Sequence, residues 1–578
     1  MSKSLDECTR EELLEIIHNL KSRKKFGLVW EDKPEHVAID CLSKIPVIQE
    51  CPEREISQES GSEATHLIIE GDNYHALSIL NYTHAKRIDV IYIDPPYNTG
   101  NKDFIYNDHF VDVEDGFRHS KWLSFMSKRL ELAKGLLSDE GVIFISIDDN
   151  EHAHLRVLCD SIFSRQNFVT TIHCQMSTTQ GLKVRAAQKG NVVKNGEYIL
   201  CYAMNGRKNI ARELLYDLRP EYDSHYNKYI QEGGQIVPLK EVYNFHFPAD
   251  LPSQKALKLP EAYRRSDDFF DFVEREKANI VRGHTVTGFT DLDSIEQDRW
   301  TEVQRDGKPY LLSLDSKGSV YQLLRLSDSW GRTDGYKNEE GLRKIRGDWW
   351  EGFFTDMGNV SKEGGVPFKN GKKPVRLIKQ LVKMASKKDS IVLDFFAGSG
   401  TTAQAVLEQN QEDGGSRQFI LSTNNENNIA DKATFPRVRN VIHGYGNREG
   451  VEANLRYFQT AFVEKASASD QTRMSLRRQT EDMIKVRENA FAVKGEGKEW
   501  RVLTGASAYT AIVFDSAAIE EAKEYIATLP TSSPINIYIF SMSSDSFKSD
   551  FLDLKHDVIL CPIPESILEV YLRTAGKG

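Results

Sequence analysis

Short apolar runs alternate with one amphipathic segment over the first part of the chain. The runs are THLIIEGD (65–72), RIDVIYID (87–94) and EGVIFISIDD (140–149). In the segment 119–137, between the last two runs, apolar side chains recur at helical spacing, at Trp122, Met126, Leu130, Ala133 and Leu137. Strands that alternate with helices are typical of a parallel sheet covered on both faces. We therefore predict an α/β fold with a doubly wound sheet.

The pattern is lost after about residue 204 and returns near residue 361. Between these positions the chain is polar and aromatic, with many charges and no βα period. A second βα unit opens in SIVLDFFAGSGTTAQAVLEQ (390–409), and RQFILST (417–423) supplies its next strand. We therefore expect one half of the sheet to be separated from the other by a long insertion.

Smaller parts are expected at both ends. An amphipathic helix is indicated near Leu13 and Leu20, and the runs YTAIVFDS and INIYIFSM, with a helix between them, predict a small separate α/β unit near the C-terminus. The predicted domains are an N-terminal helical extension (1–60), a first half of the core (61–204), the insertion (205–360), a second half of the core (361–465), and a linker helix with the C-terminal unit (466–578).

Composition fits a soluble protein of several domains. The chain has 578 residues, 40% of them hydrophobic and 28% charged. It has no apolar run near the roughly 18 to 20 residues that a membrane-spanning helix needs. The polar start is unlike a secretory signal, so we expect a cytoplasmic protein without membrane contact. The seven cysteines are scattered and never in CxxC spacing, which favours reduced thiols and no structural metal site.

Charge is unevenly distributed along the chain. The net charge is −10, yet the stretch from 163 to 213 holds eight Lys/Arg against two acidic residues. A second basic run lies between 342 and 383. Runs of this kind are either solvated faces or surfaces for a polyanion, so the net negative charge does not exclude a nucleic-acid partner.

A glycine turn marks the start of the second βα unit. LDFFAGSGTT (393–402) falls where a strand passes into a helix, and Gly398 and Gly400 would let a ligand approach the backbone. The lysine of a phosphate-binding P-loop is missing, and so is the full GxGxxG pattern of dinucleotide folds. The alternative interpretation is a tight turn with no ligand.

A more specific signal is DPPY at 94–97. Asp94 ends an apolar strand, at the end of a parallel strand where α/β proteins bind ligands. Pro95 and Pro96 hold the chain extended and have no N–H groups, so the Asp94 carboxylate and the Pro95 carbonyl are available as acceptors. These two acceptors suit an exocyclic amino group, and the Tyr97 ring offers a stacking face. The alternative is a strand that ends in a proline turn.

Together, DPPY and DFFAGSG (394–400) resemble the two signature motifs of DNA amino-methyltransferases, which transfer a methyl group from S-adenosylmethionine to adenine N6 or cytosine N4. The catalytic motif comes first and the insertion lies between the two, as in the β group of that family. IIEGDNYHAL, GVIFISIDDNE and ATFPRVRNVIHGYGN resemble the modification (Mod) subunits of type III restriction–modification systems. The resemblance covers roughly residues 20–204 and 360–490 and is weak in the insertion.

The resemblance implies a Rossmann-like, S-adenosylmethionine-dependent methyltransferase core with permuted motif order, and a target-recognition domain in the insertion. It implies that Asp94, Pro95, Pro96 and Tyr97 form the catalytic motif. The cofactor S-adenosylmethionine would lie against Asp394, Phe396, Ala397, Gly398, Ser399 and Gly400, with Lys373 and Pro374 lining the same pocket.

Two further cofactor residues are less specific. Asp72 ends a neighbouring strand and is expected either in the cofactor pocket or as the N-cap of the helix that follows. Family members often place a ribose-binding acid after the next strand. Here FILSTNNENN offers Glu426 or Asn424, and the alternative for either is a plain turn residue.

The leading hypothesis is a DNA adenine-N6 methyltransferase that acts on double-stranded DNA with a separate helicase–nuclease restriction subunit. The resemblance also implies a homodimer, and the acidic C-terminal unit is a candidate docking surface for the partner. The alternatives are a solitary methyltransferase, a cytosine-N4 enzyme, a specificity subunit that mainly binds DNA, and a methyltransferase for RNA or protein. Asp rather than Ser at position 94 favours adenine.

Overall fold

The computed structural model describes residues 30–575 and Thr9, except for 58–64, 102, 108, 181, 207–209, 247–258, 287–294, 306–307, 315–317, 368–370, 466–468, 506–507, 531–532, 542–546 and 564. The amphipathic helix expected near Leu13 lies outside the described residues. The chain divides into two compact units, one formed by residues 1–212 with 356–578 and the other by residues 213–355. Within the described residues, no helix combines the length and the apolar character needed to span a membrane.

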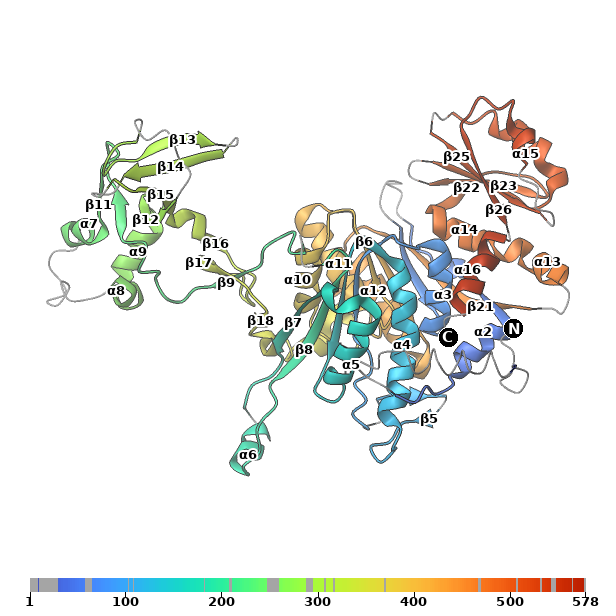
Figure 1. Ribbon diagram of the computed structural model, residues 1–578, viewed down its shortest axis with the longest axis horizontal. Helices are drawn as coiled ribbons and strands as arrows, with labels where there is room; N and C mark the ends of the chain where they lie inside the picture. Colours follow the sequence, from blue (N-terminus) through green and yellow to red (C-terminus); the bar gives the residue numbers. More distant parts are fainter. Residues whose placement is uncertain are drawn as a thin grey trace. The chain divides into compact units, whose positions relative to one another are not determined.

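The first unit is built on a large mixed sheet (Figure 1). Its strands are β1 (Lys44–Glu50), β2 (Thr65–Glu70), β3 (Ile88–Ile93), β6 (Leu137–Ile147), β7 (Phe168–Gln175), β8 (Gly196–Ala203), β19 (Ile391–Asp394), β20 (Gln418–Thr423) and β21 (Asn454–Glu464). They lie in the order β1-β21-β2-β20-β19-β3-β6-β8-β7. The strands from β21 to β6 are mutually parallel, whereas β1, β8 and β7 each run antiparallel to their neighbours.

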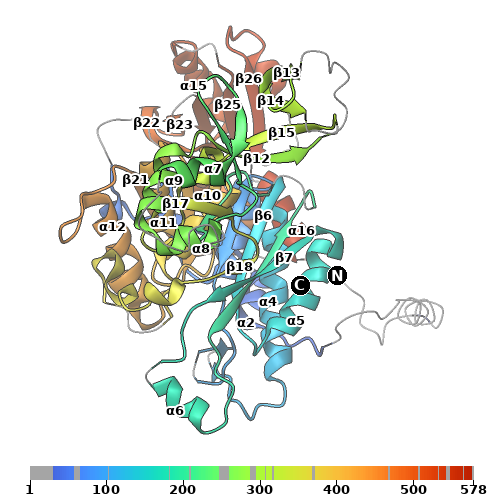
Figure 2. The same cartoon turned by 90° about the vertical axis from the view of Figure 1, so that its left-hand side faces the viewer.

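Helices cover both faces of this sheet (Figures 1 and 2). The helices of this part are α2 (His36–Ser43), α3 (Asn73–Thr83), α4 (Arg118–Leu136), α5 (His152–Cys159), α6 (Leu182–Gln188), α10 (Val375–Ala385), α11 (Thr401–Asp413) and α12 (Phe435–His443), with a two-stranded ribbon of β4 (Ile105–Tyr106) and β5 (His109–Phe110). Helices α3, α4 and α5 pack in sequence on one face, and α10, α11 and α12 on the other. The predicted α/β fold with a doubly wound sheet is confirmed.

Two local expectations differ from the structure. The N-terminal extension (1–60) was expected to contain a helix and a polar link, but residues 44–50 form the buried β1, which pairs with β21 at the edge of the sheet. The helix expected over 119–137 is α4, but Leu137 already begins β6. In both places an apolar side chain packs equally well in a helix or a strand, and the sheet determines which one forms.

The C-terminal region has its own sheet in the order β22-β23-β24-β25-β26. Its elements are α13 (Ser469–Gln479), α14 (Glu481–Glu488), β22 (Ala490–Glu496), β23 (Trp500–Gly505), β24 (Tyr509–Val513), α15 (Ile519–Ile526), β25 (Ile535–Phe540), β26 (Val558–Ile563) and α16 (Glu565–Ala575). Ile484 and Tyr571 belong to the same hydrophobic cluster as the main sheet, and the Tyr571 hydroxyl donates to Pro46 O at 2.5 Å. The region is therefore less separate than the sequence suggested.

The second unit has a six-stranded and a three-stranded sheet. Its elements are β9 (Tyr216–Leu218), β10 (Lys228–Ile230), β11 (Ile236–Pro238), α7 (Leu239–His246), α8 (Leu259–Arg265), α9 (Asp267–Glu276), β12 (Ile280–Thr285), β13 (Thr301–Arg305), β14 (Lys308–Leu314), β15 (Val320–Arg325), β16 (Trp330–Arg332), β17 (Glu340–Ile345) and β18 (Trp349–Trp350). The larger sheet runs β11-β10-β12-β15-β14-β13 and the smaller one β16-β17-β9. Trp330 is buried in a hydrophobic cluster of this unit and Trp350 is also buried, whereas Trp349 is exposed.

Candidate active site

The two motif turns of the sequence meet at one edge of the sheet. Asp94 follows β3 and Asp394 ends β19, and these strands are parallel neighbours with Val392 opposite Val90. Parallel neighbours expose their carboxyl ends at the same edge, where open α/β sheets bind ligands. The structure therefore brings the DPPY turn and the glycine turn side by side, as the sequence predicted.

Three polar side chains converge on Asp94. The Tyr97 hydroxyl lies 3.0 Å from Asp94 Oδ1 and 3.1 Å from Glu197 Oε2. Lys373 Nζ donates to the Tyr97 hydroxyl and to Glu197 Oε2, both at 2.7 Å, and lies 3.4 Å from Asp94 Oδ1. The cluster thus holds two carboxylates, one ammonium group and one phenol.

Burial and neighbouring charges both shift the pKa values in this cluster. Burial raises the pKa of Asp94, and the Lys373 ammonium partly offsets this increase. Burial alone would lower the pKa of Lys373, but Asp94 and Glu197 outweigh it and raise that pKa. Burial, together with Asp94 and Glu197, raises the pKa of Tyr97 well above its usual value. Tyr97 is therefore a neutral phenol and Lys373 a stable cation.

The two prolines leave one carbonyl of the turn available. Trp122 Nε1 donates to Pro96 O at 2.7 Å, which anchors the turn to the buried face of α4. Pro95 O has no hydrogen-bond partner among the described residues. Asp94 and the Pro95 carbonyl are thus two acceptors at the tip of β3, the type of group that binds the hydrogens of an amino group.

The glycine turn is held by hydrogen bonds from several directions. Asp394 Oδ1 accepts from Phe396 N at 3.0 Å and Oδ2 accepts from the Thr402 hydroxyl at 2.5 Å. Gly398 and Gly400 have φ of 49° and 77°, in the region where a Cβ is unfavourable. Burial raises the pKa of Asp394 to about 7 in spite of these two hydrogen bonds. Asp394 therefore shapes the turn that leads into α11.

Other predicted cofactor residues are engaged within the protein. Ala397 N donates to Ser422 O at 3.1 Å, and the Ser399 hydroxyl accepts from Arg437 at 3.0 Å. Pro374 is the N-cap residue of α10, which places Lys373 directly before that helix. The Lys373 side chain turns toward Asp94 and Tyr97, on the amine side of the cleft predicted by the motifs.

Asp72 is the N-cap of α3, which was the alternative to a place in the cofactor pocket. Its Oδ1 accepts from Tyr74 N at 2.7 Å and so caps α3. The same carboxylate pairs with the buried Arg129 at 3.2 Å, and Arg129 in turn pairs with Glu35. Glu426 begins a short 3-10 turn three positions after β20 ends at Thr423. Its role toward a ribose stays a prediction.

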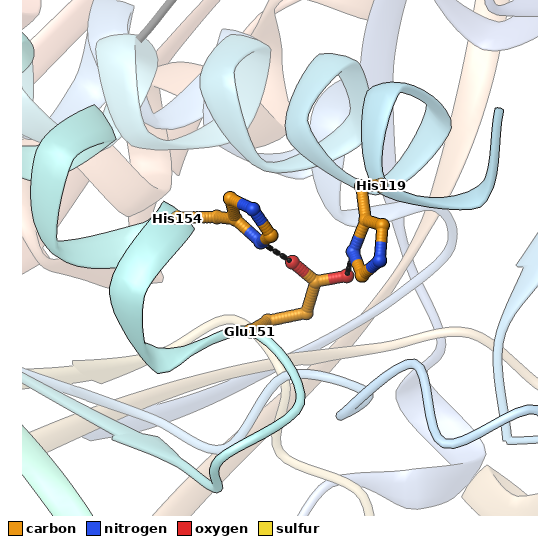
Figure 3. Close-up of side chains that lie close together, drawn as sticks. All are labelled: His119, Glu151 and His154. Atoms are coloured by element: carbon orange, nitrogen blue, oxygen red, sulfur yellow. Dashed lines mark hydrogen bonds and ion pairs between the residues drawn. The ribbon is translucent and has the colours of Figure 1, made fainter. Parts of the chain in front are cut away.

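Sequence reasoning missed a cluster in which His119 and His154 both bond to the Glu151 carboxylate (Figure 3). Glu151, whose side chain is fully buried, accepts from His119 Nδ1 at 2.6 Å, His154 Nδ1 at 2.8 Å and Asn98 Nδ2 at 2.6 Å. The possible metal-ligand atoms of His119, Glu151 and His154 lie within 4.8 Å of one another, a spacing that also suits a metal ion. Here three hydrogen bonds satisfy the carboxylate, and the bond to Asn98, at a positive φ of 56°, fixes the residue after Tyr97.

Comparison with known proteins matches this arrangement to one family. The DNA methylase family matches residues 88–435, which include both motif turns and the insertion between them. The chain belongs to the DNA methylase family.

Curated proteins and solved structures resemble the chain to different extents. The type III restriction–modification enzyme StyLTI Mod subunit of Salmonella typhimurium is 32% identical over 64% of this chain and 54% of its own length. The chain thus spans about half the length of this curated relative. Type II methyltransferase M.KpnI of Klebsiella pneumoniae is 30% identical over 64% of this chain and 84% of its own length. A solved DNA modification methylase, TTHA0409 of Thermus thermophilus in complex with S-adenosyl-L-methionine, is 14% identical over 68% of this chain and 99% of that chain, with a TM-score of 0.31.

Proposed function

We propose that this DNA methylase transfers a methyl group from S-adenosylmethionine to the N6 amino group of adenine in double-stranded DNA. The observation that carries the proposal is the pairing of β3 with β19, which sets the acceptors of Asp94 beside the glycine turn after Asp394. An amino group held at the DPPY turn would face a ligand held at the glycine turn. Direct transfer between them needs proximity and alignment but no covalent enzyme intermediate.

Asp94 and the Pro95 carbonyl prepare the amine. The lone pair of an exocyclic amine is delocalised into the ring, which makes the nitrogen a poor nucleophile. Two acceptors that bind its hydrogens favour a pyramidal nitrogen with a more available lone pair. A base inside a duplex cannot reach this recess, so the proposal requires the adenine to be extruded and stacked on the Tyr97 ring.

The residues of the glycine turn fit S-adenosylmethionine. A Cβ at Gly398 would meet only Phe396 O, at 3.8 Å, so the backbone is open to a ligand on that side. Helix α11 begins at Thr401 and directs the positive end of its dipole toward the turn, where a carboxylate is stabilised. When bound, the cofactor supplies a methyl group on a positively charged sulfur. Phe396, Gly398 and Gly400 would position it, while Asp394 keeps the turn in shape through Phe396 N and Thr402.

A basic arm beside the site is the proposed contact to DNA phosphates. The arm is residues 176–195, which join β7 to β8 and carry α6 at their far end (Figure 2). It contains Lys183, Arg185, Lys189 and Lys194 and no acidic residue. Lys194 is paired with Asp148 and Asp149, whereas Arg185 and Lys189 are exposed and have no ion pair among the described residues. Such cations bind phosphates without reading sequence.

The second unit, residues 213–355, is the proposed target-recognition domain. We further propose that the protein is the homodimeric Mod subunit of a type III system, that it works in the cytoplasm, and that a restriction subunit supplies DNA cleavage. The similarity to the StyLTI Mod subunit supports this interpretation. The second candidate is a solitary methyltransferase, because M.KpnI is matched over 84% of its length and is a type II enzyme.

Single-molecule sequencing of DNA from cells that express only this chain tests the proposal. N6-methyladenine is expected in one recurring short motif, and it should be absent in cells that express the Asp94→Ala variant at equal levels. N4-methylcytosine in a recurring motif would identify a cytosine enzyme. If wild-type cells carry no modified base at any motif, the proposed activity is wrong. Purification of the chain from its native cells then separates the two hypotheses. A helicase–nuclease subunit that co-purifies supports the type III hypothesis, and its absence supports the solitary one.

A further inference from the structure

The Tyr97 hydroxyl has one proton and two carboxylates within reach. Asp94 Oδ1 lies at 3.0 Å and Glu197 Oε2 at 3.1 Å, so either can accept the O–H. Lys373 Nζ already donates to the Tyr97 oxygen at 2.7 Å, which leaves one more acceptor position on that oxygen. Tyr97 can therefore receive a proton from one carboxylic acid while it gives its own proton to the other carboxylate.

Lys373 keeps this geometry in place. Its three N–H groups match three oxygens, those of Tyr97 and Glu197 at 2.7 Å and that of Asp94 at 3.4 Å. One ammonium group against two carboxylates leaves an excess negative charge in a cluster with only limited access to water. Uptake of one proton removes this excess, which makes the cluster suited to accept a proton from the substrate side.

Glu197 connects the cluster to solvent. Asp94 has 20% of its side chain exposed at the tip of β3, while the Glu197 side chain is 28% exposed at the start of β8. Glu197 also lies where the arm 176–195 enters β8. A proton that reaches Glu197 can therefore leave the protein while a DNA base still covers Asp94.

We propose that Asp94, Tyr97 and Glu197 form a relay that removes the proton released by the methylated amine. This inference rests on the proposed amino-methyl transfer. The amine nitrogen forms a bond to the methyl carbon as the carbon–sulfur bond breaks, and the nitrogen then carries one proton too many. That proton passes to the Asp94 carboxylate. Asp94 passes it to the Tyr97 oxygen as the Tyr97 proton moves to Glu197, and Glu197 releases it to water.

In this scheme Tyr97 has a role beyond stacking. Tyr97→Phe keeps the aromatic face and removes the relay, so the variant separates the two functions. Glu197→Gln keeps the size of the side chain and its hydrogen bond from Lys373 but removes the final proton acceptor. Glu197 does not touch the substrate in this scheme. It accepts the proton of Tyr97 and so affects the reaction only through that residue.

The experiment uses the full chain and a duplex with the sequence motif found by methylome sequencing. Multiple-turnover methyl transfer is measured for wild type, Tyr97→Phe, Glu197→Gln and the double variant between pH 5.5 and 9, because the relay acts after the nitrogen–carbon bond has formed and returns Asp94 to the carboxylate for the next cycle. Each single variant should be at least tenfold slower and should lose the acidic limb of the wild-type pH profile. The double variant should be no slower than the slower single variant, because both changes break the same path.

Two further measurements exclude a merely structural role. Added formate or acetate should accelerate a third variant, Glu197→Ala, in which truncation leaves room for a small carboxylate at a partly exposed position, and should not accelerate Tyr97→Phe. Fluorescence of 2-aminopurine at the target position and calorimetric binding of S-adenosylmethionine should be unchanged in Tyr97→Phe and Glu197→Gln. Wild-type rates in either single variant, multiplicative losses in the double variant, or an equal loss of base extrusion would overturn the relay. If the wild-type chain itself methylates no DNA, it is the proposed function that fails.

Discussion

Lys373 Nζ donates a hydrogen bond to the Tyr97 hydroxyl across 276 positions of sequence. The bond joins the two halves of the permuted core, because Tyr97 follows β3 and Lys373 precedes α10. The same ammonium group lies 3.4 Å from Asp94 and partly offsets the rise that burial causes in the pKa of that carboxylate. The cofactor half of the chain thereby sets the charge state of the catalytic half.

Replacement of Lys373 by methionine should therefore move the pH dependence of methyl transfer. Without the cation, burial and Glu197 both raise the pKa of Asp94, so its carboxylate form requires a higher pH. We expect a loss of at least tenfold at pH 7 and partial recovery toward pH 9, measured as single-turnover rates. Lys379→Met is the matched control, since Lys379 lies on α10 but pairs with Glu412 away from the cluster. Equal pH profiles for the two variants would contradict the assignment.

The glycine turn allows a test that separates ligand binding from backbone strain. Gly398 (φ 49°) and Gly414 (φ 65°), which ends α11, both have positive φ and open space where a Cβ would stand. Alanine at either position should cost about 1 kcal/mol of stability through strain. Only Gly398→Ala should weaken binding of S-adenosylmethionine, by tenfold or more in calorimetry. If Gly414→Ala weakens binding as much, the turn is not the cofactor site.

The sequence predicted the two halves of the site because each is a local pattern. An apolar strand followed by DPPY, and another followed by a glycine turn, both place their ends at the carboxyl edge of a parallel sheet. Their direct pairing through Val90 and Val392 follows from the strand order of the assembled sheet. Asp72, in contrast, could not be assigned, because its partner Arg129 comes from a distant helix.

Glu197 was missed for a topological reason. A parallel β8, as the alternating pattern suggests, would put its first residues at the opposite edge from Asp94. The structure pairs β8 antiparallel to β6, with Tyr198 opposite Ile147, so the amino end of β8 lies at the carboxyl edge. A single sequence contains no signal for that reversal. Lys373 was expected in the cofactor pocket because of the family resemblance. A sequence does not show that its long side chain reaches Tyr97.

Charge reversal on the arm should weaken DNA binding without loss of cofactor binding. Arg185 and Lys189 lie on an arm that has no acidic residue, and Arg185→Glu with Lys189→Glu replaces two phosphate contacts by repulsion. The slope of log affinity against log salt should fall by about 1.8, which is roughly 0.9 per lost contact. Lys86→Glu is the control, because Lys86 is exposed but pairs with Asp139. An unchanged salt slope in the double variant would show that DNA does not contact the arm.

Two buried histidines should make the fold sensitive to acid. His66 stacks on Phe419 with ring centroids 4.2 Å apart, and its Nδ1 accepts from Phe419 N at 3.1 Å, so the neutral ring is required. Burial lowers the pKa of His66 to about 3, and burial lowers that of His84 to about 3 as well. An unfolded histidine has a pKa of about 6.5, so between about pH 6.5 and 3 the unfolded chain binds more protons. Stability is therefore complete above this window and falls as the pH falls through it.

The contribution of His66 can be isolated by substitution. His66→Asn keeps an acceptor for Phe419 N but cannot take up a proton, so its loss of stability in acid should be smaller than that of the wild type by about 2 kcal/mol at pH 5. The measurement is the difference in Tm between pH 7.5 and pH 5 for each protein. Comparison of this difference between the wild type and the variant cancels the contribution of the carboxylates, which both proteins share. His443→Asn, at an exposed position of α12, should behave as the wild type. If the Tm falls by the same amount between the two pH values in the wild type, His66→Asn and His443→Asn, then His66 is not a source of the acid sensitivity.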